Sequence, residues 1–175
     1  MNHIQRARYG SNNWLESDLR ERLNSSAAVG AHAWTPKNPW SRKPTWNNTA
    51  AGFMYGLDKD FVSALGKVTK TTSKNTVTDG GGGVQSEELF FLLSRSEVYN
   101  SAEISGVNEG SVYSYYKNAT DAERIKMLNG SARGWWLRTP HASHAYSVRV
   151  VSTSGALNSS NANGTNGVAP ACCII

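Results

Sequence analysis

The residues with catalytic or metal-binding potential are few, and they do not converge in the sequence. The chain has four histidines (His3, His32, His141 and His144), of which only the last two are close together. They can form a metal-binding pair, but no third ligand lies near them, because Asp and Glu are absent after Glu123. Zinc and calcium sites need a larger set of ligands. We therefore expect no metal, and we expect the two histidines to face solvent or a partner.

Nucleophilic chemistry has no better support. The only two cysteines, Cys172 and Cys173, are adjacent, and neighbouring cysteines rarely bridge each other because the geometry is strained. We expect them to be buried thiols in a terminal strand. No GxSxG motif occurs, and the glycine run at 80–83 has neither the Walker spacing nor a following Lys-Ser/Thr. The sequence thus predicts no catalytic residue and no cofactor, and we disfavour an enzyme.

Composition indicates one mildly basic globular domain over residues 1–175. The chain has six Trp, seven Tyr and four Phe as large apolar anchors for a core. Its net charge is +5, but no basic stripe interleaved with aromatic residues occurs, so we expect no nucleic-acid partner. No apolar run approaches the length of a membrane span, which predicts no membrane insertion. The start, MNHIQRARYG, does not have the apolar stretch of a secretory signal.

Two segments, residues 11–26 and 56–67, have the period of amphipathic helices. In each, a large apolar residue recurs every four positions, at Leu15, Leu19 and Leu23 in the first and at Leu57, Phe61 and Leu65 in the second. Between them, residues 33–49 hold three Pro and three Trp, and we expect a loop pinned by aromatic anchors. The pattern predicts two main helices in the first part of the chain, and Ser11, Asn12 or Asn13 can cap the first of them.

The C-terminal part is typical of β structure. Residues 134–140, 146–157 and 167–175 are expected to form three strands, with a hairpin turn at 152–155. Shorter strands are expected at 67–72 and 89–94. Helices that precede a group of strands predict an α+β domain.

The polar stretch 158–167 separates the last two of these strands. It holds four Asn, two Ser, two Gly, one Thr and one Ala. A tail of this composition would stay disordered, but a strand on each side anchors this one. Loops with fixed ends often carry binding residues, so we expect a binding loop here.

Six segments together resemble a bacterial and phage family, the domain of unknown function DUF6273. They are NNWLESDLRERLNS, GLDKDFVSALGKV, KNTVTDGGG, FFLLSRSEVY, GWWLRTP and NGVAPACCII. The match extends from Tyr9 to Ile175. The resemblance implies a C-type-lectin-like fold, related to formylglycine-generating enzymes, with two main helices and a small antiparallel sheet among long loops. It also implies additional chain, including a first strand, before Tyr9.

Members of this family look like the variable proteins of diversity-generating retroelements. In those systems reverse transcription misreads template adenines, which makes Asn codons the mutational targets, and the fold displays the changes as a ligand-binding surface. Adenine changes in AAC or AAT cannot produce Lys, Glu, Gln, Met or Trp. These five types make up 27 of the 175 residues, yet His141–Asn166 contains none of them. At the rate of the whole chain about four are expected there, so the composition agrees with the resemblance.

The resemblance and the strand alternation together predict a variable display region at about 139–167. Its scaffold positions are Val148, Val150 and Leu157, which we expect to face the core. The candidate ligand-binding residues are those expected to project elsewhere: His141, Ser143, His144, Tyr146, Arg149, Asn158, Ser160, Asn161, Asn163, Thr165 and Asn166. Tyr offers contact area at low entropic cost, while Ser and Asn adapt their hydrogen bonding.

The function that this implies is ligand recognition by a retroelement-diversified surface, with a host or cell-surface protein or a surface polymer as the partner. The expected location is a phage virion or a bacterial cell surface, as part of a larger protein or assembly. A calcium-independent carbohydrate-binding module and a structural module at a phage fibre tip are the alternatives. The EPN, QPD and WND motifs of calcium-dependent lectins do not occur. The sequence leaves the ligand and the oligomeric state open.

Overall fold

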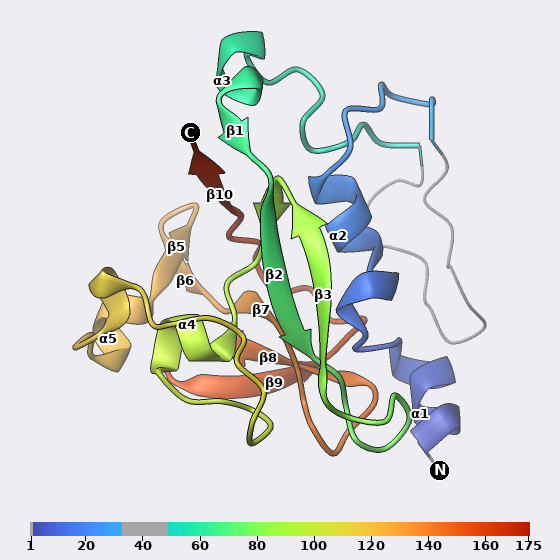
Figure 1. The fold of residues 1–175 in the computed structure, drawn as a ribbon, viewed down its shortest axis with the longest axis vertical. Coiled ribbons are helices and arrows are strands. Elements are labelled where there is room, and N and C mark those ends of the chain that lie inside the picture. The colour runs from blue at the N-terminus through green and yellow to red at the C-terminus, as the bar shows by residue number, and fades with distance from the viewer. Residues whose placement is uncertain (1, 33–48) are drawn as a thin grey trace.

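The computed structural model describes residues 2–32 and 49–175, and in them short helices alternate with small antiparallel sheets (Figure 1). The helices and 3₁₀ turns are α1 (Asn2–Tyr9), η1 (Trp14–Glu16), α2 (Asp18–Leu23), α3 (Lys59–Ser63), α4 (Arg95–Tyr99), η2 (Ser114–Tyr116) and α5 (Asp121–Arg124). The expected aromatic-pinned loop at 33–49 lies, apart from its last residue, outside the described residues.

The strands pair into four antiparallel sheets, in the orders β1-β10-β4, β2-β3, β5-β6 and β7-β8-β9. Their bounds are β1 (Leu65–Gly66), β2 (Val68–Ser73), β3 (Gly83–Glu88), β4 (Phe90–Phe91), β5 (Lys126–Leu128), β6 (Ser131–Arg133), β7 (Trp135–Pro140), β8 (Ser147–Val151), β9 (Leu157–Asn161) and β10 (Ala171–Ile174). Figure 1 shows the β2–β3 hairpin along the middle of the molecule, with α1 and α2 on one side and α4, α5 and the β5–β6 hairpin on the other.

The expected C-type-lectin-like α+β fold with two main helices is wrong. The helix expected at 11–26 is divided into η1, which Asn13 caps, and α2, which Ser17 caps. Ser17 lies between these two helices, and its backbone is extended. A cap residue ends the preceding turn as well as starting the next one. The helix expected at 56–67 is reduced to the five residues of α3, after which the chain extends into β1. Small antiparallel sheets, and not helices, dominate the architecture.

The C-terminal strands were predicted more accurately. β7 and β8 lie within the expected segments 134–140 and 146–157, and the turn at 152–155 joins β8 to β9. Leu157, expected to end the second strand, instead begins β9, so part of the polar stretch is itself a strand. β10 contains both cysteines, which are half-buried and not fully buried as expected.

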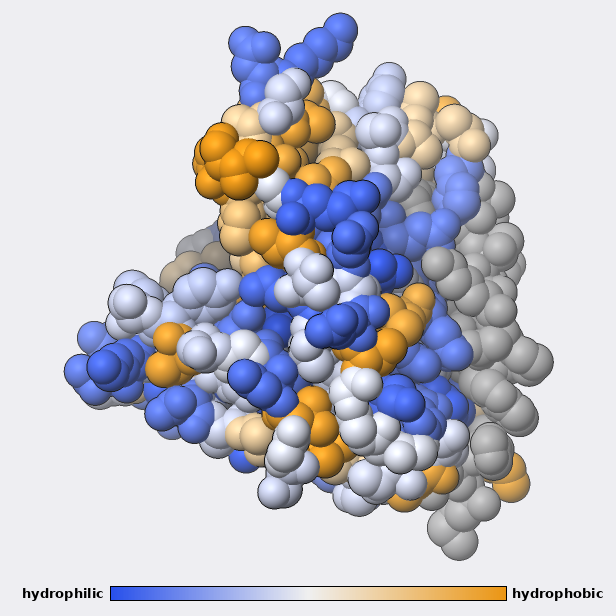
Figure 2. Space-filling model, in the orientation of Figure 1, coloured by the Kyte–Doolittle hydropathy of each residue, from blue (hydrophilic) through white to orange (hydrophobic). Residues whose placement is uncertain are grey.

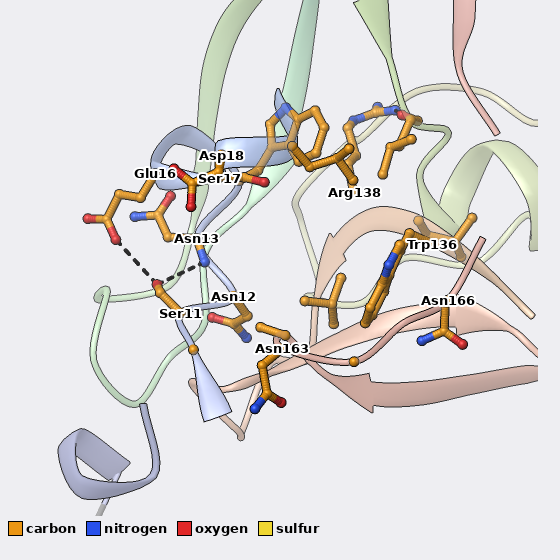
Figure 3. Close-up of a pocket in the computed structure, with 18 of the residues that line it drawn as sticks. Ser11, Asn12, Asn13, Glu16, Ser17, Asp18, Trp136, Arg138, Asn163 and Asn166 are labelled. Atoms are coloured by element: carbon orange, nitrogen blue, oxygen red, sulfur yellow. Dashed lines mark hydrogen bonds between the residues drawn. The ribbon is translucent and has the colours of Figure 1, made fainter. Parts of the chain in front are cut away.

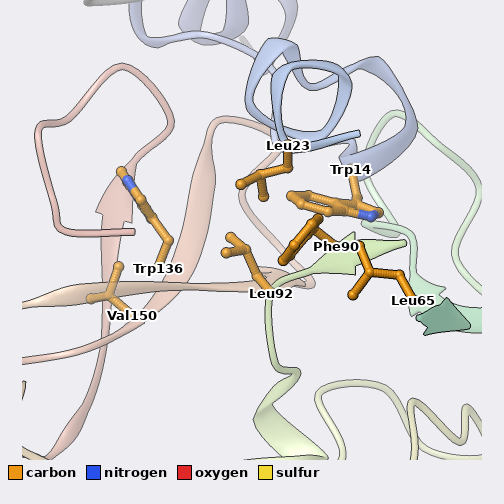
Figure 4. Packing of buried hydrophobic residues seen from close by; sticks show 7 residues of the cluster. All are labelled: Trp14, Leu23, Leu65, Phe90, Leu92, Trp136 and Val150. Atoms are coloured by element: carbon orange, nitrogen blue, oxygen red, sulfur yellow. The ribbon is translucent and has the colours of Figure 1, made fainter. Parts of the chain in front are cut away.

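Strand β7 is buried on both faces and separates two hydrophobic clusters. Trp136 belongs to the first cluster, with Trp14, Leu23, Leu65, Phe90, Leu92 and Val150 (Figure 4). Trp135 belongs to the second, with Val98, Tyr116, Leu137 and Val151. Successive side chains of a strand point to opposite faces, so the Trp-Trp pair anchors both clusters at once. On the face seen in Figure 2, hydrophobic side chains form small separate patches among hydrophilic ones.

Buried carboxylates connect segments that are distant in the sequence. Arg138 of β7 donates to Glu97 Oε2 at 2.5 Å and also to the carbonyl of Glu109. The Glu109 carboxylate accepts from Ser73 N at 2.9 Å and from Thr139 Oγ1 at 2.7 Å. Burial raises the pKa of Glu109. Because buried polar groups must be paired, these contacts fix β7 to the surrounding loops. In the described part of the chain, no helix is long and apolar enough to cross a bilayer.

Candidate functional site

The polar stretch 158–167 is held in place by its backbone. The N–H of Ala162 donates to the Tyr146 carbonyl at 2.8 Å, and the N–H of Asn163 donates to the Tyr9 carbonyl at 2.9 Å. At the far end, Gly167 N–H donates to Gly134 O at 2.7 Å, and its own carbonyl accepts from Trp136 N at 3.0 Å. None of these bonds uses a side chain of the stretch, so they can form whichever side chains its non-glycine positions carry.

The side chains of this stretch make few hydrogen bonds. Among the described residues, no side-chain hydrogen bond is made by Ser160, Asn161, Asn163, Thr165 or Asn166. Asn158 accepts only from the N–H of its neighbour Ser159. Asn158, Asn163 and Thr165 are exposed, and the other three candidates are half-buried.

Two hollows lie beside the stretch and share the residues Thr165 and Asn166. The first is a cavity of about 200 Å³ between the N-terminal segment 10–19 and residues 162–168. The second, about 450 Å³, is more open and lies between β6, the β8–β9 turn and β9. Asn163 lines the first, and Asn158 and Ser160 line the second. Thr165 and Asn166 thus line both hollows and form a rib between them.

The first hollow has an apolar floor and a polar rim. Trp136, Leu92 and Val148 contribute apolar surface. Ser11, Asn13, Glu16, Ser17 and Asp18 lie on the opposite side from Asn163 and Asn166 (Figure 3). The one cation in the lining, Arg138, is fully buried and is neutralised by Glu97. The hollow is therefore polar at its mouth and apolar at its base.

The four candidates of the 141–146 turn form a separate group. The rings of His141 and His144 have centroids 4.3 Å apart, and those of His144 and Tyr146 are 5.6 Å apart. Tyr9 continues the row, 5.5 Å from Tyr146. Burial, together with the positive charge of Arg149, lowers the pKa of His141. Ser143 is exposed beside this aromatic row and donates its N–H to His141 Nδ1 at 3.2 Å.

Arg149 is engaged in the scaffold. Its Nε and Nη2 donate to Glu103 at 2.7 and 2.8 Å, and Arg95 donates to the same carboxylate. In β8, Arg149 lies opposite Ser159, whereas Val148 and Val150 lie opposite Ser160 and Asn158. Strand alternation therefore places Asn158 and Ser160 on one face and Arg149 and Asn161 on the other. The candidates do not share a single face.

The scaffold positions were predicted with partial success. Val150 is buried, while Val148 and Leu157 are half-buried and pack against the two clusters. Trp135, Trp136 and Leu137 are all buried, as expected for an apolar strand. The same expectation for Val168 is wrong, because this side chain is 45% exposed.

The N-terminal wall of the first hollow was missed by sequence reasoning. Asn12, read as one of three possible helix caps, is buried and donates from Nδ2 to the carbonyls of His144 and Ser147, both at 2.8 Å. Its Oδ1 accepts from Asn75 at 2.9 Å. The signal available was the pair Asn12–Asn13 ahead of a helix that needs only one cap. Asn12 joins the N-terminal segment to the turn that carries the aromatic row.

A metal centre has no support in the described residues, in which no three His, Cys, Asp or Glu side chains gather. Asp58, which lies outside the display region, uses its carboxylate to cap α3. What the geometry defines is a polar surface with two hollows and an aromatic row.

Comparison with known families gives this surface a context. The model of a domain of unknown function, DUF6273, matches residues 2–175, and the chain belongs to this family. No curated protein and no solved structure matches the chain.

Proposed function

We propose that the protein is a ligand-binding display protein whose region 139–167 recognises a macromolecular partner and is diversified by a retroelement through adenine mutagenesis. The observation that carries the proposal is the separation of roles in 158–167. Its backbone is tied at both ends by main-chain hydrogen bonds, while its side chains make almost no hydrogen bonds to the scaffold. A surface of this kind accepts new side chains without a change of fold.

The chemistry of the side chains agrees with recognition. Asn, Ser and Thr border the two hollows, and a tyrosine and two histidines form the neighbouring aromatic row. Adaptable polar groups beside rigid aromatic anchors are typical of paratopes. A protein or surface polymer of a phage host or neighbouring cell is the kind of partner that we propose.

The test is a library that randomises the side chains that face the hollows and the aromatic row and leaves the scaffold unchanged. The positions are 141, 143, 144, 146, 158, 160, 161, 163, 165 and 166. We expect most members to fold and selection against unrelated proteins and glycans to yield binders to several of them. A matched library at ten buried scaffold positions should fold rarely. If the display library folds no better than the scaffold library, the proposal is wrong.

A second test is genetic. Diversification by a retroelement requires, near the gene, a reverse transcriptase and a near-copy of the gene's 3′ end that differs only at adenines. A fixed structural module at a fibre tip would instead vary evenly among sibling sequences.

A further inference from the structure

Trp136 has an unused hydrogen-bond donor beside the first hollow. Among the described tryptophans, Trp14 donates its indole N–H to Glu88 at 3.2 Å, and Trp135 donates to the Arg124 carbonyl at 3.0 Å. The Nε1–H of Trp136 has no protein partner in the described part of the chain, and solvent reaches this nitrogen although the residue as a whole is only 8% exposed. An indole N–H in this position is free to donate to a ligand.

The unused donor faces the hollow. Figure 3 shows the indole edge that carries the nitrogen turned toward the space beside Asn12 and Asn163, and Figure 4 shows the same edge turned away from the apolar cluster. Leu92 and Val148 lie beside it in the lining. A group that fills the base of the hollow should therefore present an acceptor to Trp136 and a small apolar part to its neighbours.

The rim offers neutral groups to a ligand. Glu16 lies 4.0 Å from Arg6, and Arg138 pairs with Glu97, so these charged side chains are engaged within the protein. Asn163 and Asn166 offer amide groups that both donate and accept hydrogen bonds.

We propose that this hollow binds the acetamido group of an N-acetylhexosamine in a surface polymer. The acetamido group combines a carbonyl acceptor for Trp136 Nε1–H, a methyl for the apolar floor, and an N–H for the amide oxygen of Asn163 or Asn166. A cavity of about 200 Å³ has room for one such substituent and part of its ring. The second hollow, across the rib of Thr165 and Asn166, is lined by hydroxyl and amide side chains and receives the next sugar.

A glycan fits the two hollows better than a peptide segment does. The lining of the second hollow has no large aromatic or aliphatic pocket for a peptide side chain, only Val150 among small and polar residues and Arg133. Hydroxyl-rich sugars match such surfaces because each hydroxyl can donate and accept. This inference rests on the proposed function and assigns a ligand class to the same site.

The experiment is an NMR titration of ¹⁵N-labelled protein with N,N′,N″-triacetylchitotriose, with cellotriose as the matched control that has hydroxyls in place of acetamido groups. We expect the chitotriose to shift the indole N–H signal of Trp136 and the side-chain amides of Asn163 and Asn166, with no effect on the indole signals of Trp14 and Trp135. Cellotriose should bind at least about tenfold more weakly, as expected for one lost hydrogen bond and a lost methyl contact. Nε-acetyl-lysine amide, which carries the same acetamido group on an amino-acid side chain, is titrated as a third ligand.

Two variants confirm the contact. Trp136→Phe, checked for folding by circular dichroism, should weaken chitotriose binding about tenfold because it removes only the N–H donor and part of the ring. Asn163→Ala leaves the fold intact and should weaken it about threefold. Ser105→Ala, on an exposed loop outside both hollows, should have no effect.

Equal binding of both trisaccharides, no binding of either, or preference for acetyl-lysine amide over chitotriose would each overturn the assignment. In those cases the display library described above still decides the proposed function, because its targets include proteins. The two proposals can therefore fail separately.

Discussion

At the residue scale, the display region contains positions that differ sharply in tolerance. Gly155, in the β8–β9 turn, has a positive φ of 85°, and a Cβ there would overlap the backbone carbonyl of Asp121. Its own carbonyl accepts from Tyr99 Oη at 2.5 Å. Asn161, six residues later, makes no side-chain hydrogen bond within the described part of the chain. Within region 139–167, the structural environment of a residue therefore decides whether it tolerates substitution.

We therefore expect Gly155→Ala to destabilise the protein by about 2–4 kcal/mol, through an unfavourable φ and a clash with backbone. Asn161→Ala should change the free energy of unfolding by less than about 0.5 kcal/mol. Urea unfolding of both variants measures the difference. An Asn161 variant as unstable as the Gly155 variant would contradict the separation of display from scaffold.

Glu109 provides a test of burial through pH. Burial raises the pKa of its carboxyl above the ordinary value, so the folded state holds a proton that the unfolded state has released. The stability of the wild type should then rise as the pH falls from the raised pKa toward the ordinary one near 4.3. Glu109→Gln cannot ionise, so its stability relative to wild type should be highest at neutral pH and should decline on acidification. Thermal melts across this range measure it, and a relative stability that increases on acidification would show that the carboxylate is the favoured form.

At the scale of elements, the Asn12 side chain connects the N-terminal segment to the 141–147 turn, beside the Tyr9–Tyr146 ring contact and the hydrogen bond from Asn12 N–H to the Ala145 carbonyl. Asn12 is 3% exposed and satisfies carbonyls on both sides of the aromatic row. The sequence pattern indicated a capped helix here, and the local capping is real, since Asn13 and Ser17 both cap turns. The long-range partner of Asn12 has no sequence signal, because a contact across more than a hundred residues depends on how the sheets pack.

Asn12→Ala should cost about 2–4 kcal/mol, because it removes several buried hydrogen bonds and leaves the His144 and Ser147 carbonyls with their backbone donors alone. Hydrogen exchange should become faster in 141–147 before the rest of the chain is affected. Asn13→Ala is the control, since Asn13 caps only η1 and its loss should cost about 1 kcal/mol. Equal effects from the two variants would show that Asn12 is no more than a local cap.

At the scale of the whole molecule, strand periodicity predicted β7 and β8 well, because alternation is a local property. The helices failed for a physical reason: their apolar period continued across Ser17 and past Ser63, but capping and strand pairing overrode it. For the site, composition located the polar stretch. The two hollows and the aromatic row depend on how segment 10–19 packs against the C-terminal strands, and the local sequence pattern does not predict that packing.

The molecule should also fold without metal. Its fold is stabilised by two hydrophobic clusters and by ion pairs between distant segments, such as Arg20–Glu88 and Arg138–Glu97. We expect the melting temperature to be the same within about one degree with and without EDTA, because no three potential metal ligands gather in the described part of the chain. A fall of many degrees would reveal an ion that the described residues do not account for.

The rib shared by the two hollows has an evolutionary consequence. A single codon change at Thr165 or Asn166 alters both binding spaces at once, whereas a change at Asn158 or Asn163 alters only one. Mutations at the rib should therefore be epistatic with those on either side, and their effects on affinity should not add. Lineages that switch ligand would then do so mainly by mutations at Thr165 and Asn166. Mutations at the flanking positions, such as Asn158 and Asn163, would adjust the affinity for one ligand.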